Sequence, residues 1–337
     1  MEVAPVRLSI LDQSPIRLGC TAREALQETA RLVQAAESWG YHRFWVSEHH
    51  STARLAGTTP EVLLAHLGAV TSRIRIGSGG VLLPYYSSMK VAENFRMLEA
   101  LYPNRIDLGI GRAPGGDFRA MLALNRGAKR SLDEFPFQVR ELLSFLHADG
   151  PTGHPTTKVY AMPYVPEVPP VWLLGSSDTS AKLAAELGTS FAFAQFINRE
   201  GGIEAMRAYR EGFKPSIHLD APQAHVAVFV FCSDSDEELE KETAIMDLRF
   251  LWFEQGRTGE TPSADQALSY KMEPWEKERV MLNRPRVIFG KPREVKERLA
   301  ALANDYGVDE VMMVTITDTF EARLRSYELV AREFGLG

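Results

Sequence analysis

The sequence predicts an α/β fold: a closed (β/α)8 TIM barrel with an inserted loop after the seventh strand. Short apolar runs recur along the chain, longer amphipathic segments alternate with them, and no change in composition divides the 337 residues. Continuous apolar strands that alternate with helices are typical of a parallel sheet covered on both faces, and eight such units favour a barrel. We therefore expect residues 1–337 to form a single domain.

The predicted strands are runs of apolar, β-branched or aromatic residues. Strands buried on both faces read as nearly continuous apolar sequence rather than as an alternation of polar and apolar residues. The runs lie at residues 8–11, 44–46, 74–76, 106–110, 171–174, 191–194, 226–231 and 311–314.

Helix start and stop signals lie between these runs. Thr21 and Glu24 form a capping-box pattern that predicts the start of the first helix. Thr59, with a proline directly after it, predicts the start of the second. A late helix is expected to begin at Pro292 and to end before Gly307, since glycine favours the left-handed conformation that terminates helices.

Residues 256–285 interrupt the regular spacing. They follow a predicted helix near 237–253, are polar, contain glycines and prolines, and lack sustained periodicity. A connection of this length without elements of its own is usually functional or disordered. We predict that this inserted loop is a mobile lid, and we expect a second, smaller insertion at 149–170.

Composition and charge exclude several classes of function. The 38 basic residues are scattered rather than gathered in a stripe, and 44 acidic residues leave a net charge of −6, which argues against a nucleic-acid partner. Cys20 and Cys232 cannot form a disulfide framework or a CxxC metal pair. The sequence shows neither a signal peptide nor an apolar run of ~18 residues, so we expect a cytoplasmic protein without a membrane span.

Polar and glycine-rich residues occur at or directly after several predicted strands. The active site of a TIM barrel lies at the C-terminal ends of its strands, so these residues are expected to converge on one ligand. They are residues 12–14, 48–50, 77–80, 111–116 and 175–177.

Arg112 follows the fourth strand beside a glycine-rich loop. Its planar guanidinium is suited to a bidentate contact with a phosphate, and the alternative is a surface arginine in a salt bridge. Residues 109–114 nearly match the dinucleotide fingerprint GxGxxG, but they end in Pro114 and continue as a loop. A Rossmann fingerprint opens directly into a helix, so a dinucleotide site is not predicted.

Ser176, Ser177 and Ser180 lie between the fifth strand and a predicted helix. Capping of that helix by Ser177 or its neighbour would explain them. A helix N-terminus with free backbone N–H groups is also a ready anion site, to which the hydroxyls would add donors. The two roles are compatible.

His49 and His50 follow the second strand. Consecutive side chains at a strand end diverge, so the pair does not predict a metal site. A histidine is usually structural, but one placed after a barrel strand is a candidate general acid, general base or orienting donor. Glu48 is a candidate for a buried residue that orients the loop.

Taken together, these motifs resemble those of the bacterial luciferase-like flavin-dependent monooxygenases, in particular the stand-alone members. The resemblance covers nearly the whole chain, and the combination of motifs is specific although no single one is. It rests on residues 11–15 (LDQSP), 45–50 (WVSEHH), 77–84 (GSGGVLLP), 91–95 (VAENF), 103–115 (PNRIDLGIGRAPG) and 323–328 (RLRSYE).

The resemblance implies a TIM barrel, FMN as the cofactor and usually a homodimer. By motif position it implies that Arg112 binds the flavin phosphate and that Ser176, Ser177 and Ser180 complete the phosphate pocket. The luciferase catalytic subunit has a glutamate where this chain has Ser176, so the pocket is expected to rely on neutral donors.

For the flavin ring, the resemblance implies a non-prolyl cis peptide between Gly79 and Gly80 behind the isoalloxazine. Glycines also allow the ring to approach closely, and the structural alternative for this pair is a strand bulge. His49 matches the catalytic histidine of the family and would assist near the reactive flavin edge.

The implied reaction uses reduced FMN and O₂, through a flavin hydroperoxide, to oxygenate a small organic substrate. A separate flavin reductase is expected to supply the reduced FMN. The superfamily also contains F420-dependent hydride-transfer oxidoreductases and non-catalytic flavin-binding proteins, which remain alternatives. The substrate is not predicted, and four large apolar residues are candidates either for its pocket or for the core: Leu82, Phe193, Phe196 and Trp252.

Overall fold

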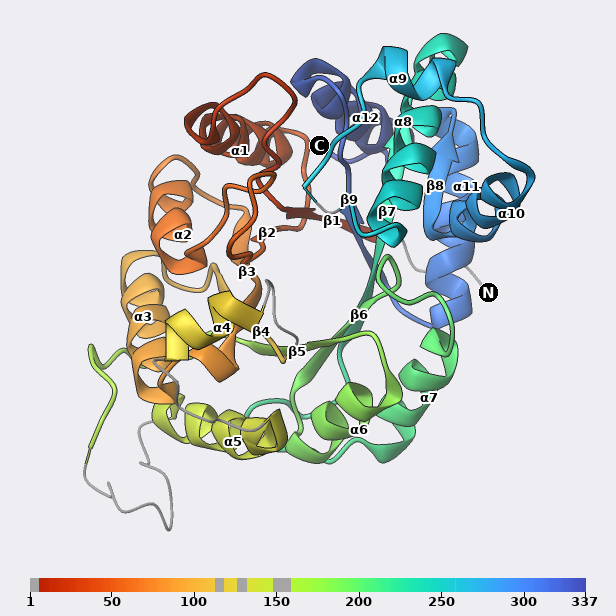
Figure 1. The fold of residues 1–337 in the computed structure, drawn as a ribbon. Helices are drawn as coiled ribbons and strands as arrows, with labels where there is room; N and C mark the ends of the chain where they lie inside the picture. Colours follow the sequence, from red (N-terminus) through yellow and green to blue (C-terminus); the bar gives the residue numbers. More distant parts are fainter. Residues whose placement is uncertain (1–5, 113–117, 126–131, 148–158, 258) are drawn as a thin grey trace.

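The computed structural model describes residues 6–112, 118–125, 132–147, 159–257 and 259–337. A ring of parallel strands forms the centre of the molecule, and helices surround it (Figure 1). The strands are β1 (Arg7–Asp12), β2 (Arg43–Val46), β3 (Arg75–Leu82), β4 (Ile106–Gly111), β5 (Val171–Gly175), β6 (Ser190–Ala194), β7 (Ala224–Cys232), β8 (Val287–Gly290) and β9 (Glu310–Val314).

The barrel is closed by eight of these strands, which confirms the predicted fold class. Strands β1 to β7 pair in sequence order, and β9 joins β7 to β1. Each of the eight predicted runs lies in or overlaps one of these strands.

The ninth strand, β8, was not predicted. It pairs with the second half of β7, where Phe229 contacts Val287 and Cys232 contacts Gly290. Strand β9 pairs with residues 226–229 of β7, so β8 lies outside the closed ring as an extension beside β7. Its apolar run is short and lies directly between the insertion and Pro292, so it lacked the flanking pattern that marks the other strands.

The helices alternate with the strands as expected. They are α1 (Ala22–Ser38), α2 (Pro60–Ala69), α3 (Ser88–Leu101), α4 (Phe118–Asn125), α5 (Phe135–Leu146), α6 (Asp178–Leu187), α7 (Gly202–Gly212), α8 (Asp236–Glu254), α9 (Ala264–Ser269), α10 (Pro274–Asn283), α11 (Pro292–Tyr306) and α12 (Phe320–Phe334). Within the described part of the chain, no helix combines the length and the apolar composition needed to cross a bilayer.

The start and stop signals for helices act as the sequence predicts. The Thr21 hydroxyl accepts a hydrogen bond from the Glu24 backbone N–H at 3.3 Å, and the Glu24 carboxylate accepts from the Thr21 N–H at 2.7 Å. Helix α11 begins at Pro292 and ends at Tyr306, directly before Gly307, which has a φ of +62°. These boundaries depend on neighbours within a few residues, so local sequence specifies them.

The insertion at 256–285 differs from the expected structureless loop, because it contains α9 and α10. Both helices begin with reciprocal capping pairs, Ser263 with Gln266 and Glu273 with Glu276. Helix α9 packs on α8 through Ala267, which belongs to an apolar cluster with Leu248 and other α8 residues. Helix α9, with 6 residues, carries too few turns to show a periodic pattern in sequence. Of the second expected insertion, 149–170, residues 149–158 lie outside the described part of the chain.

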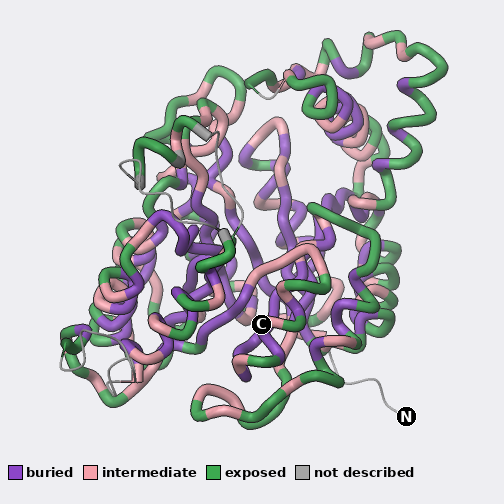
Figure 2. Tube along the Cα trace, turned by 60° about the horizontal axis from the view of Figure 1, so that its bottom comes forward, coloured by how far each residue is buried: buried purple, intermediate pink, exposed green. Residues whose placement is uncertain are grey.

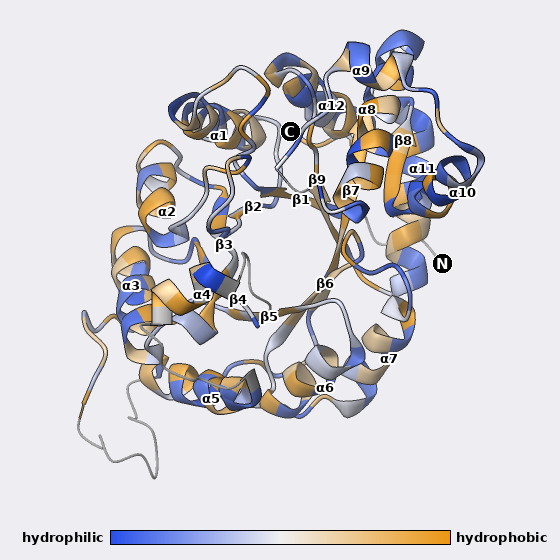
Figure 3. Cartoon of the chain, viewed as in Figure 1, coloured by the Kyte–Doolittle hydropathy of each residue, from blue (hydrophilic) through white to orange (hydrophobic). Residues whose placement is uncertain are grey.

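Buried residues concentrate in the strands and on the inward faces of the helices (Figure 2). The hydropathy of the chain follows the same division, with apolar strands inside helices that carry both polar and apolar residues (Figure 3). The main core fills the space between the strands and the surrounding helices. A separate apolar cluster fills the barrel interior, and it includes Leu11, Trp45, Trp172 and Met312.

A buried ion-pair network lies at the N-terminal ends of the barrel strands. Arg43 contacts Asp107 at 2.8 Å and Glu310 at 2.7 Å, and Arg75 contacts Asp107 at 2.6 Å. Burial opposes ionisation of Asp107, but the charges of Arg43 and Arg75 outweigh it and lower the pKa of this carboxyl. The network closes the end of the barrel opposite the expected active site, so ligands must enter from the C-terminal ends of the strands.

Candidate active site

A cavity of about 290 Å³ opens at the C-terminal ends of the barrel strands. Residues from the ends of β1 to β6 contribute to its wall. The seven residues that the sequence predicts for the site all line this one cavity: His49, Gly79, Gly80, Arg112, Ser176, Ser177 and Ser180. The fold therefore brings together positions that are up to 131 residues apart in the sequence.

His49 is held at the cavity wall by the loop that follows β2. Its backbone N–H donates to the carbonyl oxygen of Gly57 at 2.9 Å, and its Nδ1 lies 3.1 Å from the Ser47 hydroxyl. Burial and the neighbouring His50 lower the pKa of His49 to about 4. The imidazole is therefore neutral at pH 7, and its Nε2 makes no hydrogen bond to any described residue.

His50 does not line the cavity, and the buried carboxylate of Glu48 holds it instead. Glu48 Oε1 lies 2.6 Å from His50 Nε2 and accepts a hydrogen bond of 2.6 Å from the Tyr86 hydroxyl. The other oxygen of Glu48 accepts from the Leu82 N–H at 2.9 Å. Glu48 thus ties the loop after β2 to the end of β3, which orients His49 toward the cavity side of the loop.

The peptide between Gly79 and Gly80 is cis, as the resemblance implies. The pairing of β3 with β4 also shifts register between Ser78 and Val81, so the bulge and the cis peptide occur together. A Cβ at Gly80 would lie 2.8 Å from the carbonyl oxygen of Gly109, and one at Gly79 would lie 2.7 Å from Leu11 Cδ1. Neither position has room for a side chain.

The serines lie where β5 meets the N-terminus of α6. Ser177 is the N-cap residue, yet its side chain makes no capping hydrogen bond, so capping does not explain the hydroxyl. A Cβ at Gly175 would lie only 2.3 Å from Ser180 Cβ, which shows how closely the strand end approaches the helix. Arg112 is exposed at the end of β4, the strand that pairs with β5. A guanidinium, free hydroxyls and helix N–H groups form a donor set suited to an anion.

The structure shows which of the four apolar candidates line the cavity and which belongs to the core. Leu82, Phe193 and Phe196 line it, whereas Trp252 is buried in the separate cluster between α8 and α9. Among the described residues, no group of three or more His, Cys, Asp or Glu side chains is placed to hold a metal ion.

His225 is a cavity residue that the sequence analysis missed. It is fully buried on β7, and its ring lies 4.9 Å from that of Trp45 and 4.7 Å from that of Trp172. Neither ring nitrogen has a hydrogen-bond partner in the described structure, and burial lowers the pKa to about 4. A single histidine at the start of an otherwise apolar strand was the available signal, but the predicted strand began one residue later.

In TIM-barrel enzymes the active site lies at the C-terminal ends of the parallel strands. The cavity and its polar side chains lie at the same place here, so the fold and the site are those of a TIM-barrel enzyme. The chain belongs to the luciferase-like monooxygenase family, whose sequence profile matches residues 6–310. This membership confirms the family recognised from the motifs and, at the level of the family, the enzyme class.

Two relatives from Bacillus subtilis (strain 168) span nearly the whole chain. The uncharacterized protein YwcH is 52% identical over 98% of this chain and 99% of its own length. The N-acetyl-S-alkylcysteine monooxygenase is 41% identical over 97% of each chain. Among solved structures, apo-MsnO8 superposes with a TM-score of 0.90 at 38% identity, and it covers 98% of this chain and 99% of its own.

Proposed function

We propose that this chain is an FMN-dependent monooxygenase that uses reduced FMN and O₂ to oxygenate a small organic substrate in the cavity. The observation that carries the proposal is the arrangement of this one cavity. Anion donors lie at one rim, side-chain-free glycines and apolar residues form the wall, and a neutral histidine faces the interior. Family membership supports the same function.

The donor set fits the phosphate of FMN. Arg112 supplies the positive charge, and Ser176, Ser177 and Ser180 supply hydroxyls beside the N-terminus of α6. Charge-assisted contacts of this kind are about twice as strong as neutral hydrogen bonds. Gly79 and Gly80 would lie against the flavin ring, since they line the cavity without side chains.

When bound and reduced, the flavin supplies two electrons to O₂, so that one oxygen atom enters the substrate, the other leaves as water, and the flavin is oxidised. His49 is the proposed catalytic residue, because a neutral imidazole with a free Nε2 can act as a general base or as a hydrogen-bond partner near the reacting atoms. Phe193, Phe196 and Leu82 exclude water from that region.

The insertion at 256–285 is proposed as a lid over the cavity. It already contacts the loop after β2, because Arg54 Nη1 donates to the carbonyl oxygen of Glu260 at 2.8 Å. Closure of such segments excludes water from the reaction. A separate reductase is proposed to supply reduced FMN, since residues 109–114 lack the last glycine of a dinucleotide fingerprint. The homodimer and the cytoplasmic location stay predictions.

The test begins with titrations of the purified chain with FMN and with F420, each reduced under anaerobic conditions. We expect FMN to bind more tightly. Oxygen labelled with ¹⁸O is then added with an N-acetyl-S-alkylcysteine, the substrate type in the name of the 41% identical relative, and we expect one labelled atom in the product. Preferential F420 binding with hydride transfer would replace the proposal, and FMN binding without oxygenation of any substrate tried would favour a flavin carrier.

A further inference from the structure

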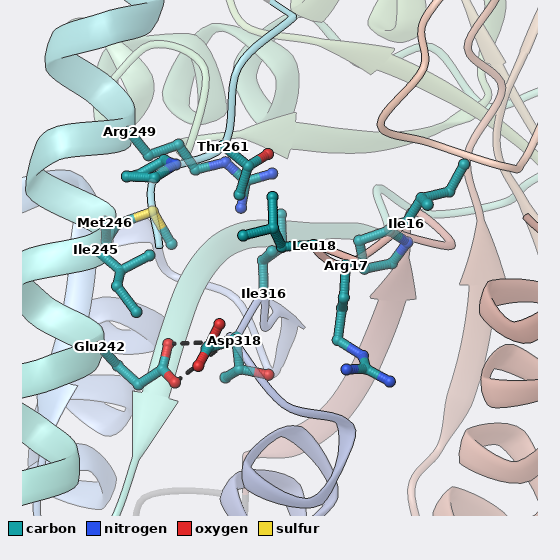
Figure 4. Close-up of a pocket in the computed structure, with 13 residues that line it drawn as sticks. Ile16, Arg17, Leu18, Glu242, Ile245, Met246, Arg249, Thr261, Ile316 and Asp318 are labelled. Carbon is teal, nitrogen blue, oxygen red and sulfur yellow. Dashed lines mark hydrogen bonds between the residues drawn. The ribbon is translucent and has the colours of Figure 1, made fainter. Parts of the chain in front are cut away.

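A second, smaller pocket lies at the mouth of the barrel (Figure 4). It shares no lining residue with the cavity that holds the proposed flavin site. Its volume is about 20 Å³, which accommodates one small polar group. The loops after β1 and β9, helix α8 and the insertion contribute its walls. Apolar side chains predominate, namely Ile16, Leu18, Ile245, Met246 and Ile316, and Arg249 and Thr261 lie together at one end.

Arg249 is the unusual member of this pocket because its guanidinium has no direct partner among the described residues. It makes no hydrogen bond or ion pair with any residue that the structure describes. By contrast, the buried guanidinium groups of Arg43 and Arg323 are paired with carboxylates. Glu242 of the same pocket acts on Arg249 only through space and does not contact it. A guanidinium held in a pocket without a directly bonded carboxylate is an open binding position for an anion.

A second arginine, Arg54, lies beside the same pocket. Its backbone carbonyl accepts from the N–H of Ile16 at 2.7 Å, and its side chain reaches the carbonyl oxygen of Glu260, next to Thr261. It has no carboxylate partner in the described residues, and its Nε is buried without a hydrogen bond. Burial lowers the pKa of Arg249 to about 10, the nearby charge of Arg54 adds to this effect, and the charge of Glu242 offsets part of it.

The acidic residues of the pocket lie at its other end. Figure 4 places Glu242 and Asp318 away from the Arg249 guanidinium. Both oxygens of Glu242 accept from the Asp318 N–H at 3.2 Å, and Lys241 Nζ lies 3.7 Å from Glu242. Burial raises the pKa of Glu242 to about 7, so at neutral pH this group carries only part of a charge. Arg17, the other arginine in the pocket, is already paired with Glu28.

We propose that this pocket binds the anionic end of the substrate, a carboxylate held by Arg249 with Arg54 as the second cation. The apolar part of the substrate then extends past Met246 and Ile316 toward the flavin cavity. These two residues pack in the apolar cluster that includes the cavity residues Leu11 and Met312. The substrate class is a small carboxylate with an apolar body, and the assignment rests on the proposed function because oxygenation must occur in that cavity.

The test uses hexanoate and its neutral analogue hexanamide as probes, titrated calorimetrically into the FMN-loaded protein. Bound FMN occupies Arg112, so the carboxylate cannot bind there instead. We expect the wild type to prefer hexanoate. Arg249→Met should weaken hexanoate binding by roughly tenfold or more while hexanamide binding is unchanged, since contacts to charged groups are the strong ones. Arg54→Gln should give a smaller loss.

Arg293→Met is the matched control, because Arg293 is an exposed arginine of α11 paired with Glu297. It should bind hexanoate as the wild type does. Equal binding of hexanoate and hexanamide by the wild type, an unchanged affinity in Arg249→Met, or an equal loss in the control would each overturn the proposal. Failure of FMN to bind in a separate titration would instead refute the proposed function.

If Arg249→Met does not fold, phenylglyoxal modification of the wild type gives the answer. Hexanoate should slow the modification of Arg249, located by peptide mass spectrometry, and hexanamide should not. Equal rates with the two probes would overturn the proposal.

Discussion

Gly175→Ala tests whether the contact between β5 and α6 positions the phosphate donors. The added Cβ would lie 2.3 Å from Ser180 Cβ and 2.5 Å from Ser180 Oγ. Carbon atoms in contact are normally 3.5–4.0 Å apart, so the first turn of α6 must move by roughly 1 Å. Such overpacking typically destabilises a protein by about 1–3 kcal/mol. Because Ser177 and Ser180 move with the helix, we expect FMN affinity to fall about tenfold or more.

The assays are urea unfolding and a flavin fluorescence titration. Gly212→Ala is the control, since its Cβ would meet its nearest neighbour, Ala185 Cβ, at an ordinary 3.6 Å. The double variant Gly175→Ala with Ser180→Gly removes the clashing atoms, so its stability should match that of Ser180→Gly alone. If the double variant is as unstable as Gly175→Ala, or if Gly175→Ala binds FMN as the wild type does, the reasoning is wrong.

The remaining predictions concern charge, catalysis, closure and acid stability. Arg112→Ala should weaken FMN binding by about one to two orders of magnitude in the same titration, since a charge-assisted contact contributes ~1.5–3 kcal/mol. His49→Ala should slow oxygenation at least about tenfold at unchanged FMN affinity, whereas His50→Ala should act through the loop held by Glu48. Shortening 256–285 should leave FMN binding intact but release more hydrogen peroxide per turnover. His225→Phe should reduce the loss of stability on acidification, measured by urea unfolding at several pH values. The folded-state pKa of His225 is about 4, below the usual ~6.5, so between these two pH values the unfolded chain binds a proton that the folded chain does not. Acidification through this interval therefore destabilises the wild type, and the variant lacks this contribution.

Much of the architecture follows from local sequence. Thr21 with Glu24, and Pro292 with Gly307, define helix ends through contacts within a few residues, so they could be read directly. Strand β8 and helices α9 and α10 were not predicted, because they lie in or directly after a polar segment without sustained periodicity and depend on the surfaces they pack against. Phe229 of β7 supplies the pairing for β8, and α8 supplies the surface for α9.

The candidate site likewise has one part that the sequence predicts and another that requires the structure. The barrel class and the residue types at the strand ends could be predicted from the sequence, since motifs such as Glu48-His49 and Gly79-Gly80 are contiguous. The folded chain was needed to show that His225 lines the cavity, and that Arg249 lies near Arg54 with no carboxylate bonded to it among the described residues. The physical reason is that burial, pairing and pKa depend on neighbours from distant segments, which come together only when the barrel closes.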